Sequence, residues 1–143
     1  MAWILSIPMT TVITYGSFDL LHVGHTRLLE RLRGLGDHLI VAVSTNEFHR
    51  AKGKPLAMAF EERCEIIGAL RCVDQVIAEV SWEQKARDIL TYAVDIFGMG
   101  SDWTGRFDDL SRLCRVVYLP RTELTSSTEL RSVVPALSSS PCR

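Results

Sequence analysis

The sequence predicts an α/β fold in a single domain: a doubly wound, five-stranded parallel sheet with helices on both faces. Short apolar runs alternate with longer amphipathic runs, which is the strand–helix order of parallel sheets. The run at 38–43, H-L-I-V-A-V, is apolar almost throughout, as is typical of a strand covered on both faces. The length of 143 residues suits one domain, and 47% hydrophobic residues are enough for one core.

Local patterns predict each element in turn. Residues 11–15 are β-branched and aromatic and favour a strand. Residues 24–35 carry leucines at helical spacing, and the glycines at 34 and 36 end that helix. With 38–43, the remaining strands are expected at 75–78, 96–99 and 116–119. The remaining helices are expected at 60–70, 82–92, 106–113 and 126–134.

The two ends of the chain differ from its middle. Residues 1–10 are expected to be an extension, 11–134 the domain, and 135–143, rich in Ser and Pro, a flexible tail. The apolar start is too short to span a bilayer and lacks the basic flank of a secretory signal. We therefore expect a cytoplasmic protein with no membrane partner.

Charge and cysteine content argue against nucleic-acid binding and against a zinc or redox site. The formal net charge of −1 gives no electrostatic reason to expect a nucleic-acid partner, so any anion needs a local basic cluster. The four cysteines form no C-x-x-C pair, which argues against a zinc or redox site. Cys64 and Cys72 lie in apolar surroundings and are expected to be small core residues.

The segment G-S-F-D-L-L-H-V-G-H, residues 16–25, joins the first predicted strand to the first helix. Gly16 allows a sharp turn, and the helix start offers free N–H groups to an anion. His22 and His25 share one helical face, with Gly24 leaving room for a phosphate. Two unrelated histidines or half of a metal site would also fit an H-x-x-H pair. The position after the first strand favours phosphate chemistry.

Other predicted strands also end in polar loops. After the second strand come Arg50, Lys52 and Lys54, which form either a solvated surface loop or a lid over phosphates. After the fourth come 98–103, G-M-G-S-D-W, either a turn or a nucleotide contact. The segment after the fifth, 120–128, is rich in hydroxyl groups and forms either a helix cap or a second anion site. Because these loops converge on one sheet edge, we expect a phosphate-binding site there.

These motifs together resemble a known family. G-S-F-D with H-V-G-H is similar to the H-x-G-H signature of the nucleotidyltransferases. W-E-Q-K at 82–85, M-G-S-D-W at 99–103 and Y-L-P-R-T-E at 118–123 resemble segments of the glycerol-3-phosphate cytidylyltransferases. The resemblance covers about residues 12–134. It implies that CTP and sn-glycerol 3-phosphate give CDP-glycerol and pyrophosphate, by direct attack on the α-phosphorus with Mg²⁺ present.

The resemblance also implies roles for individual residues. The catalytic residues would be His22, His25, Lys52 and Arg121. The nucleotide would contact Gly16, Ser17, Phe18, Asp19, Gly24, Lys54, Arg63, Gly100, Asp102, Thr122, Ser126 and Ser127. Trp82 and Lys85 would bind the acceptor, and Mg²⁺ would come with CTP rather than on protein ligands. A homodimer and a product used for teichoic acid or capsule polymers are further implications.

The chain departs from the family pattern at three positions. Leu124 replaces a glycine, Ser101 replaces an acid, and Ser17 replaces a threonine but keeps the hydroxyl. The change at Leu124 leaves open a related transferase with another acceptor: a different polyol phosphate, phosphocholine, phosphoethanolamine, or a sugar phosphate with ATP. A nucleotide-binding module without turnover is the third alternative, and the complete set of basic and histidine residues argues against it.

Overall fold

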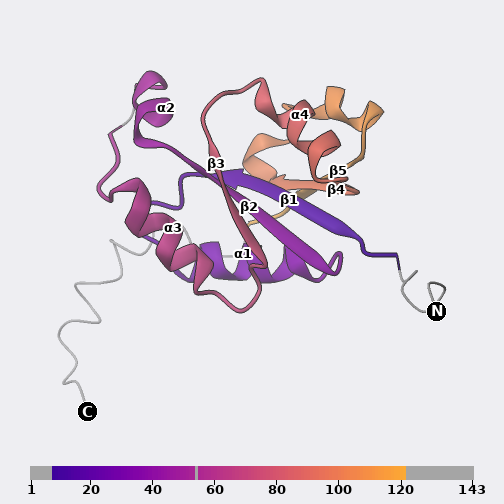
Figure 1. The fold of residues 1–143 in the computed structure, drawn as a ribbon, viewed down its shortest axis with the longest axis horizontal. Helices are drawn as coiled ribbons and strands as arrows, with labels where there is room; N and C mark the ends of the chain where they lie inside the picture. The colour runs from indigo at the N-terminus through magenta and orange to yellow at the C-terminus, as the bar shows by residue number, and fades with distance from the viewer. Residues whose placement is uncertain (1–7, 54, 122–143) are drawn as a thin grey trace, which may run out of the picture.

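A computed structural model describes residues 8–53 and 55–121. Its centre is a five-stranded sheet in the order β3-β2-β1-β4-β5, and every neighbouring pair is parallel (Figure 1). The strands are β1 (Thr11–Gly16), β2 (His38–Ser44), β3 (Gln75–Glu79), β4 (Ile96–Gly100) and β5 (Arg115–Leu119). The order reverses direction at β1, so a ligand is expected beyond the carboxyl ends of β1 and β4. The predicted doubly wound, Rossmann-like sheet is confirmed.

Four α-helices and two short 3₁₀ helices connect these strands. They are α1 (Val23–Arg33), α2 (Asn46–Ala51), α3 (Phe60–Gly68), α4 (Gln84–Thr91), η2 (Ser101–Trp103) and η3 (Asp108–Arg112). The helix expected at 106–113 is the 3₁₀ helix η3. The helix expected at 126–134 and the tail at 135–143 lie outside the described residues, as does most of the extension at 1–10.

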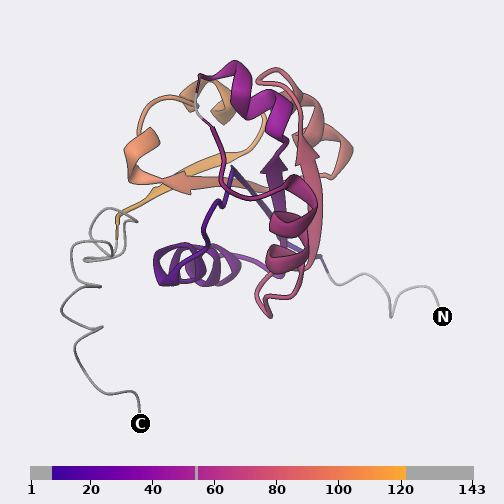
Figure 2. The ribbon, with the colours of Figure 1, turned by 90° about the vertical axis from the view of Figure 1, so that its left-hand side faces the viewer.

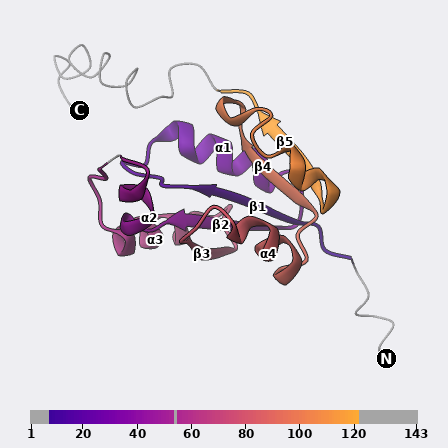
Figure 3. The same ribbon diagram turned by 90° about the horizontal axis from the view of Figure 1, so that it is seen from above.

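The sheet has two apolar faces, and each packs on different helices. Alternate residues of β2, Leu39 and Val41 among them, form one core with Leu29 and Leu32 of α1 and Ile67 of α3. The other face packs against α4 and η3 in a second core. Figure 3 shows α1 and α4 on opposite sides of the sheet. The prediction of a sheet covered on both faces is therefore correct.

The cysteines in the described part are free thiols. Cys64 and Cys72 are partly buried against the core on the α1 face, as expected of small core residues. Burial raises the pKa of both thiols, which keeps them protonated at neutral pH.

The amino ends of the strands are fastened by aspartates. Asp95 accepts from the backbone N–H of Thr11 at 2.8 Å, and Asp74 accepts from that of Leu39 at 2.8 Å. Asp74 also pairs with Arg33 at the end of α1, at 2.9 Å. These bonds satisfy amide groups that the first residues of a strand leave unpaired. The opposite, carboxyl ends of the strands are therefore left to build a site.

Helix α2 occupies the segment that the sequence suggested was a basic loop. Thr45 caps it by accepting from the backbone N–H of Phe48 at 3.1 Å. In Figure 2, α2 lies at the top and α1 at the bottom. Lys52 follows α2 directly as its C-cap residue. Within residues 8–53 and 55–121, no helix has the length and apolar character needed to cross a membrane.

Candidate active site

A cavity of about 620 Å³ opens at the carboxyl ends of the strands. Residues from β1, β2, β3, β4 and β5 line it, together with the start of α1 and the end of α2. Of the residues assigned from the sequence, it brings together Gly16, Ser17, Phe18, His22, Gly24, His25, Lys52, Trp82, Lys85, Gly100, Asp102 and Arg121. The expected convergence of loops from separate strands is confirmed, while the role of each residue stays a prediction.

The two histidines form the start of α1. His22 is the N-cap, and its Nδ1 accepts from the backbone N–H of Gly24 at 3.0 Å. His25 closes the box in return, because its Nδ1 accepts from the backbone N–H of His22 at 3.1 Å. The rings lie 4.0 Å apart, centroid to centroid. This is a capping box built from imidazoles in place of the usual hydroxyl and carboxylate.

The capping bonds fix the tautomer of both rings. A neutral imidazole whose Nδ1 accepts must carry its proton on Nε2. Burial, followed by the neighbouring His22, lowers the pKa of His25 to about 4, and burial also lowers the pKa of His22. Both rings are therefore neutral at pH 7 and offer Nε2–H donors at the wall of the cavity. Such donors stabilise negative charge on a ligand without exchanging a proton with it.

A strained turn supports this arrangement. Phe18 has a φ of 53°, which is costly for a residue with a bulky side chain. Its ring is buried and packs edge-on against His25, with centroids 5.7 Å apart. A Cβ on Gly16 would come within 3.0 Å of the same ring. The glycine and the phenylalanine together set the position of the His25 ring.

Another part of the cavity lining combines cations with aromatic rings. The ammonium group of Lys52 lies 4.1 Å from the Phe48 ring centroid and 4.5 Å from that of Trp82. The ammonium group of Lys85 lies 4.6 Å from the Trp82 ring. Two ammonium groups therefore share one indole ring, and both line the cavity. An anionic group entering between them would be attracted by both.

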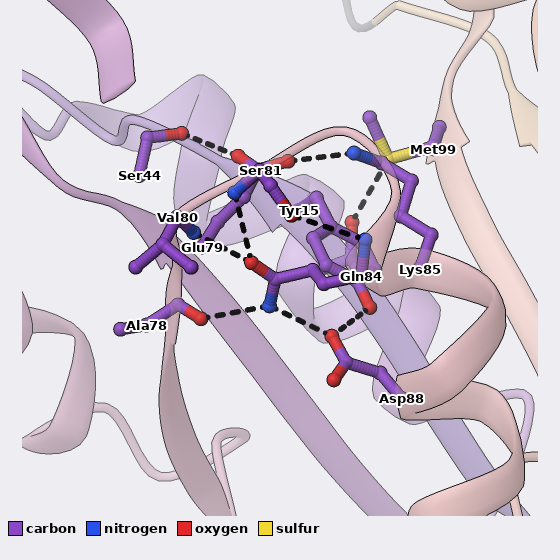
Figure 4. Close-up of polar contacts among 11 residues, drawn as sticks. Tyr15, Ser44, Ala78, Glu79, Val80, Ser81, Gln84, Lys85, Asp88 and Met99 are labelled. Atoms are coloured by element: carbon purple, nitrogen blue, oxygen red, sulfur yellow. Dashed lines mark hydrogen bonds and ion pairs between the residues drawn. The ribbon is translucent and has the colours of Figure 1, made fainter.

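Lys85 is buried, unlike most lysines. Its side chain is only 4% exposed and forms an ion pair with Glu79, Nζ to Oε2 2.7 Å, where the Glu79 side chain is 3% exposed. Glu79 also accepts from the Ser44 hydroxyl at 2.6 Å (Figure 4). A buried ion pair is stable only when its remaining polar atoms find partners.

A second set of buried polar groups lies beside that pair. Gln84 accepts from the backbone N–H groups of Val80 and Ser81, at 2.6 and 3.1 Å, which fixes the loop that carries Trp82. Its amide also donates to Asp88 at 2.9 Å. Asp88 accepts from the Tyr15 hydroxyl at 2.6 Å (Figure 4). Burial, followed by Asp88, raises the pKa of Tyr15, so the phenol stays protonated as a donor.

Two predicted nucleotide contacts, Asp19 and Arg63, do not line the cavity. Asp19 accepts from the backbone N–H groups of Ala57 and Met58, at 2.9 and 3.0 Å, and so holds the segment after Lys52. Arg63, only 1% exposed, lies beneath the loops rather than on the surface. Its guanidinium donates to the carbonyls of Ser17 (2.8 Å), Ser44 (2.7 Å) and Met58 (3.2 Å), and to Asn46 Oδ1 (2.8 Å). In this structure both side chains tie loops together, and their predicted contacts with the nucleotide stay predictions.

Arg121 is a further cation that lines the cavity, in addition to Lys52 and Lys85. Arg121 pairs with Asp102 at 3.0 Å, and both side chains are about 60% exposed (62% and 61%). Arg31 of α1 donates to the carbonyl of Pro120 at 2.8 Å, which fastens the chain just before Arg121. Lys54, Thr122, Ser126 and Ser127, the other predicted contacts, lie outside the described residues.

Sequence reasoning missed several cavity residues. Among them are Tyr15, Arg31, Ser44, Glu79 and Phe107. Glu79 follows the last residue of the strand expected at 75–78, and an acid at a strand's carboxyl end was the signal that could have identified it. Trp103, the last residue of η2, has its ring centroid 6.2 Å from that of Trp82 and so extends the aromatic wall.

Metal-binding groups are few in this region. The part of the chain that the structure describes holds no cluster of three or more His, Cys, Asp or Glu side chains placed to bind a metal ion. The two acids that line the cavity, Glu79 and Asp102, are each paired with a cation.

The sequence is similar to those of several known enzymes of one name. The chain is 51% identical to the glycerol-3-phosphate cytidylyltransferase of Bacillus subtilis strain 168, over 90% of this chain and 100% of that protein. It is 49% identical to the enzyme of the same name from Staphylococcus aureus strain NCTC 8325, over 86% and 93% of the two chains.

A solved structure shares the fold at lower identity. A lipopolysaccharide core biosynthesis protein from Thermoplasma volcanium superposes with a TM-score of 0.69 at 24% identity, covering 81% of this chain and all of that one. Residues 13–141 match the model of the cytidylyltransferase-like family. This match takes in β1 from Ile13 onward, the other four strands, both histidines, Lys52 and Lys85. The chain therefore belongs to the cytidylyltransferase-like family.

Proposed function

We propose that this protein is a glycerol-3-phosphate cytidylyltransferase, which transfers CMP from CTP to sn-glycerol 3-phosphate and releases pyrophosphate. The observation that carries the proposal is the pair of neutral imidazoles with outward Nε2–H donors, facing a cavity that Lys52 and Lys85 also line. Relatives of that name match this chain over nearly its whole length.

The reaction needs positioning and charge stabilisation rather than a protein nucleophile. A phosphate oxygen of glycerol 3-phosphate bonds to the α-phosphorus of CTP, and the bond from that phosphorus to the bridging oxygen breaks. The electron pair leaves with pyrophosphate. The attacking phosphate is already an anion, so no general base is required. This fits a cavity wall of neutral donors and cations.

In this proposal His22 and His25 stabilise the charge that develops on the α-phosphate oxygens. Their capping bonds hold both rings before a ligand arrives, so little reorganisation is needed during the reaction. The ammonium groups of Lys52 and Lys85, which both contact the Trp82 ring, attract the acceptor phosphate. Their charge also offsets the repulsion between two anionic substrates.

Three further properties belong to the proposal. CTP enters as its Mg²⁺ complex, with the ion held by triphosphate oxygens and water, as Mg²⁺ usually is at phosphate-transfer sites. The two cavity acids, each already paired with a cation, fit an ion brought by the substrate. The homodimer rests on the family resemblance alone, and sedimentation at micromolar concentration tests it. The cytoplasmic location is the one that the sequence predicts.

The test is pyrophosphate release with CTP and Mg²⁺ across a panel of acceptors. The panel holds glycerol 3-phosphate, ribitol 5-phosphate, phosphocholine and phosphoethanolamine, with ATP replacing CTP as the nucleotide control. Release with glycerol 3-phosphate and CTP supports the proposal. Release with another acceptor keeps the mechanism and refutes the acceptor. Binding of CTP without release in any mixture would indicate a nucleotide-binding module instead.

A further inference from the structure

The ammonium group of Lys85 is surrounded mainly by aromatic rings, which do not fix its orientation. Rings of Trp82, Tyr15 and Phe107 lie 4.6, 4.7 and 5.5 Å from Nζ. Aromatic rings attract a cation without fixing the direction of its N–H bonds. Among the residues that the structure describes, Glu79 is the one acceptor to which Nζ donates a hydrogen bond, at 2.7 Å. The direction of the Lys85 ammonium group therefore depends on that carboxylate.

Glu79 is itself held firmly. It ends β3, pairs in register with Ser44 of β2, and its backbone carbonyl accepts from the N–H of Thr45 at 3.0 Å. Its Oε1 accepts from the Ser44 hydroxyl at 2.6 Å, while Oε2 faces Lys85 (Figure 4). With backbone and side chain both fixed, the carboxylate provides a rigid support for a long, otherwise flexible side chain.

The N–H donors of Lys85 that Glu79 does not use are available to a ligand in the cavity. An ammonium group has three N–H donors, and Glu79 takes one of them. Lys85 and Glu79 both line the cavity although each is almost fully buried, so a ligand reaches them at its floor. A phosphate there would bind donors that Glu79 has already oriented, and a charge-assisted hydrogen bond gains most from such orientation.

We propose that Glu79 is a positioning residue that orients Lys85 for the phosphate of the acceptor. The inference rests on the proposed function and adds to it a residue that acts through Lys85 and not on the substrate directly. It predicts a specific defect: loss of the Glu79 charge weakens acceptor binding and leaves CTP binding as it was.

The first experiment compares Glu79→Gln with Asp88→Asn as the matched control. Both remove one buried carboxylate without changing its size, but Asp88 bonds to Tyr15 and Gln84 rather than to Lys85. For Glu79→Gln, the KM for glycerol 3-phosphate should rise roughly tenfold to a hundredfold, while the KM for CTP changes less than about twofold. Asp88→Asn should leave the ratio of the two KM values unchanged. An equal rise of both KM values in Glu79→Gln would mean a general structural defect and overturn the proposal.

A double-mutant cycle separates positioning from direct contact. In a Lys85→Met background, Glu79→Gln should add no further loss of acceptor binding, because the group it orients is gone. Additive losses would mean that Glu79 contacts the acceptor by itself, and would overturn the positioning role. If Glu79→Gln does not fold, Ser44→Ala serves instead, since it frees one oxygen of the carboxylate and should raise only the acceptor KM, by a smaller factor. Wild-type turnover in the same assay tests the proposed function separately.

Discussion

The low pKa of His25 predicts that this protein loses stability in mild acid. Burial, followed by the nearby His22, lowers that pKa from the ordinary 6.5 to about 4. In the unfolded chain the ring is exposed and binds a proton near pH 6.5. Stability is therefore complete above that pH and is lost as the pH falls from about 6.5 towards 4, where the unfolded state binds more protons than the folded one.

The size of the loss follows from the two pKa values. Between about pH 7 and pH 5 the linkage relation gives a decrease of about 2 kcal/mol in the free energy of unfolding. This figure is an upper bound, because water reaches part of the ring and screens the added charge. The groups that act on His25 include Asp19, whose attraction opposes the shift without reversing it.

Urea unfolding at a series of pH values measures this effect. Carboxylates also titrate in this range, so the informative quantity is the difference between wild type and His25→Asn. Asparagine offers an oxygen near the place of Nδ1, which can accept from the N–H of His22. We expect the wild type to lose about 1–2 kcal/mol more than the variant between about pH 7 and pH 5. Parallel curves for the two proteins would refute the reasoning.

Three further predictions concern other parts of the site and fold. His22→Ala should lower kcat by about a hundredfold to a thousandfold at normal fold content by circular dichroism, since it removes a donor to the reacting phosphate; a near-normal rate would remove this residue from the mechanism. Arg63→Met should cost about 3–5 kcal/mol in urea unfolding, because it strands buried carbonyl groups; a cost below about 1 kcal/mol would contradict that account. Gly36→Ala should lower the free energy of unfolding by about 1–3 kcal/mol, since a Cβ there would lie 2.6 Å from the Thr10 carbonyl oxygen. Gly100→Ala serves as the control, because a Cβ there would have no atom within 4 Å. Equal Tm values for the two variants would contradict the packing argument.

The positions of the strands along the chain, and the sheet edge that carries the site, were predictable from the sequence. Apolar runs mark the strands because each is covered on both faces, and polar loops follow their carboxyl ends. Helix α2 was missed because only Phe48 among its residues is buried, so no helical repeat is visible. The cap at Thr45 was the available signal.

Burial of charged side chains could not be predicted in the same way. Arginine and lysine usually lie at the protein surface, yet Arg63 and Lys85 are almost fully buried. Arg63 reaches Ser17, which is 46 residues away in the chain. Lys85 pairs with the nearby Glu79, but that carboxylate is held by Ser44, which lies beside it only because β2 and β3 pair in register. Such pairs are set by strand order, which a single sequence does not display residue by residue.

The loops around the cavity are joined to one another behind its wall. Arg63 bonds to the turn after β1, the end of β2, α2 and the segment before α3, and Asp19 bonds to that same segment. In a saturation-mutagenesis screen selected on growth, intolerance at these two positions would equal that of residues touching substrate. A map of functional positions drawn from such a screen would therefore extend one layer beyond the ligand, and drug-resistance substitutions would be scarce there.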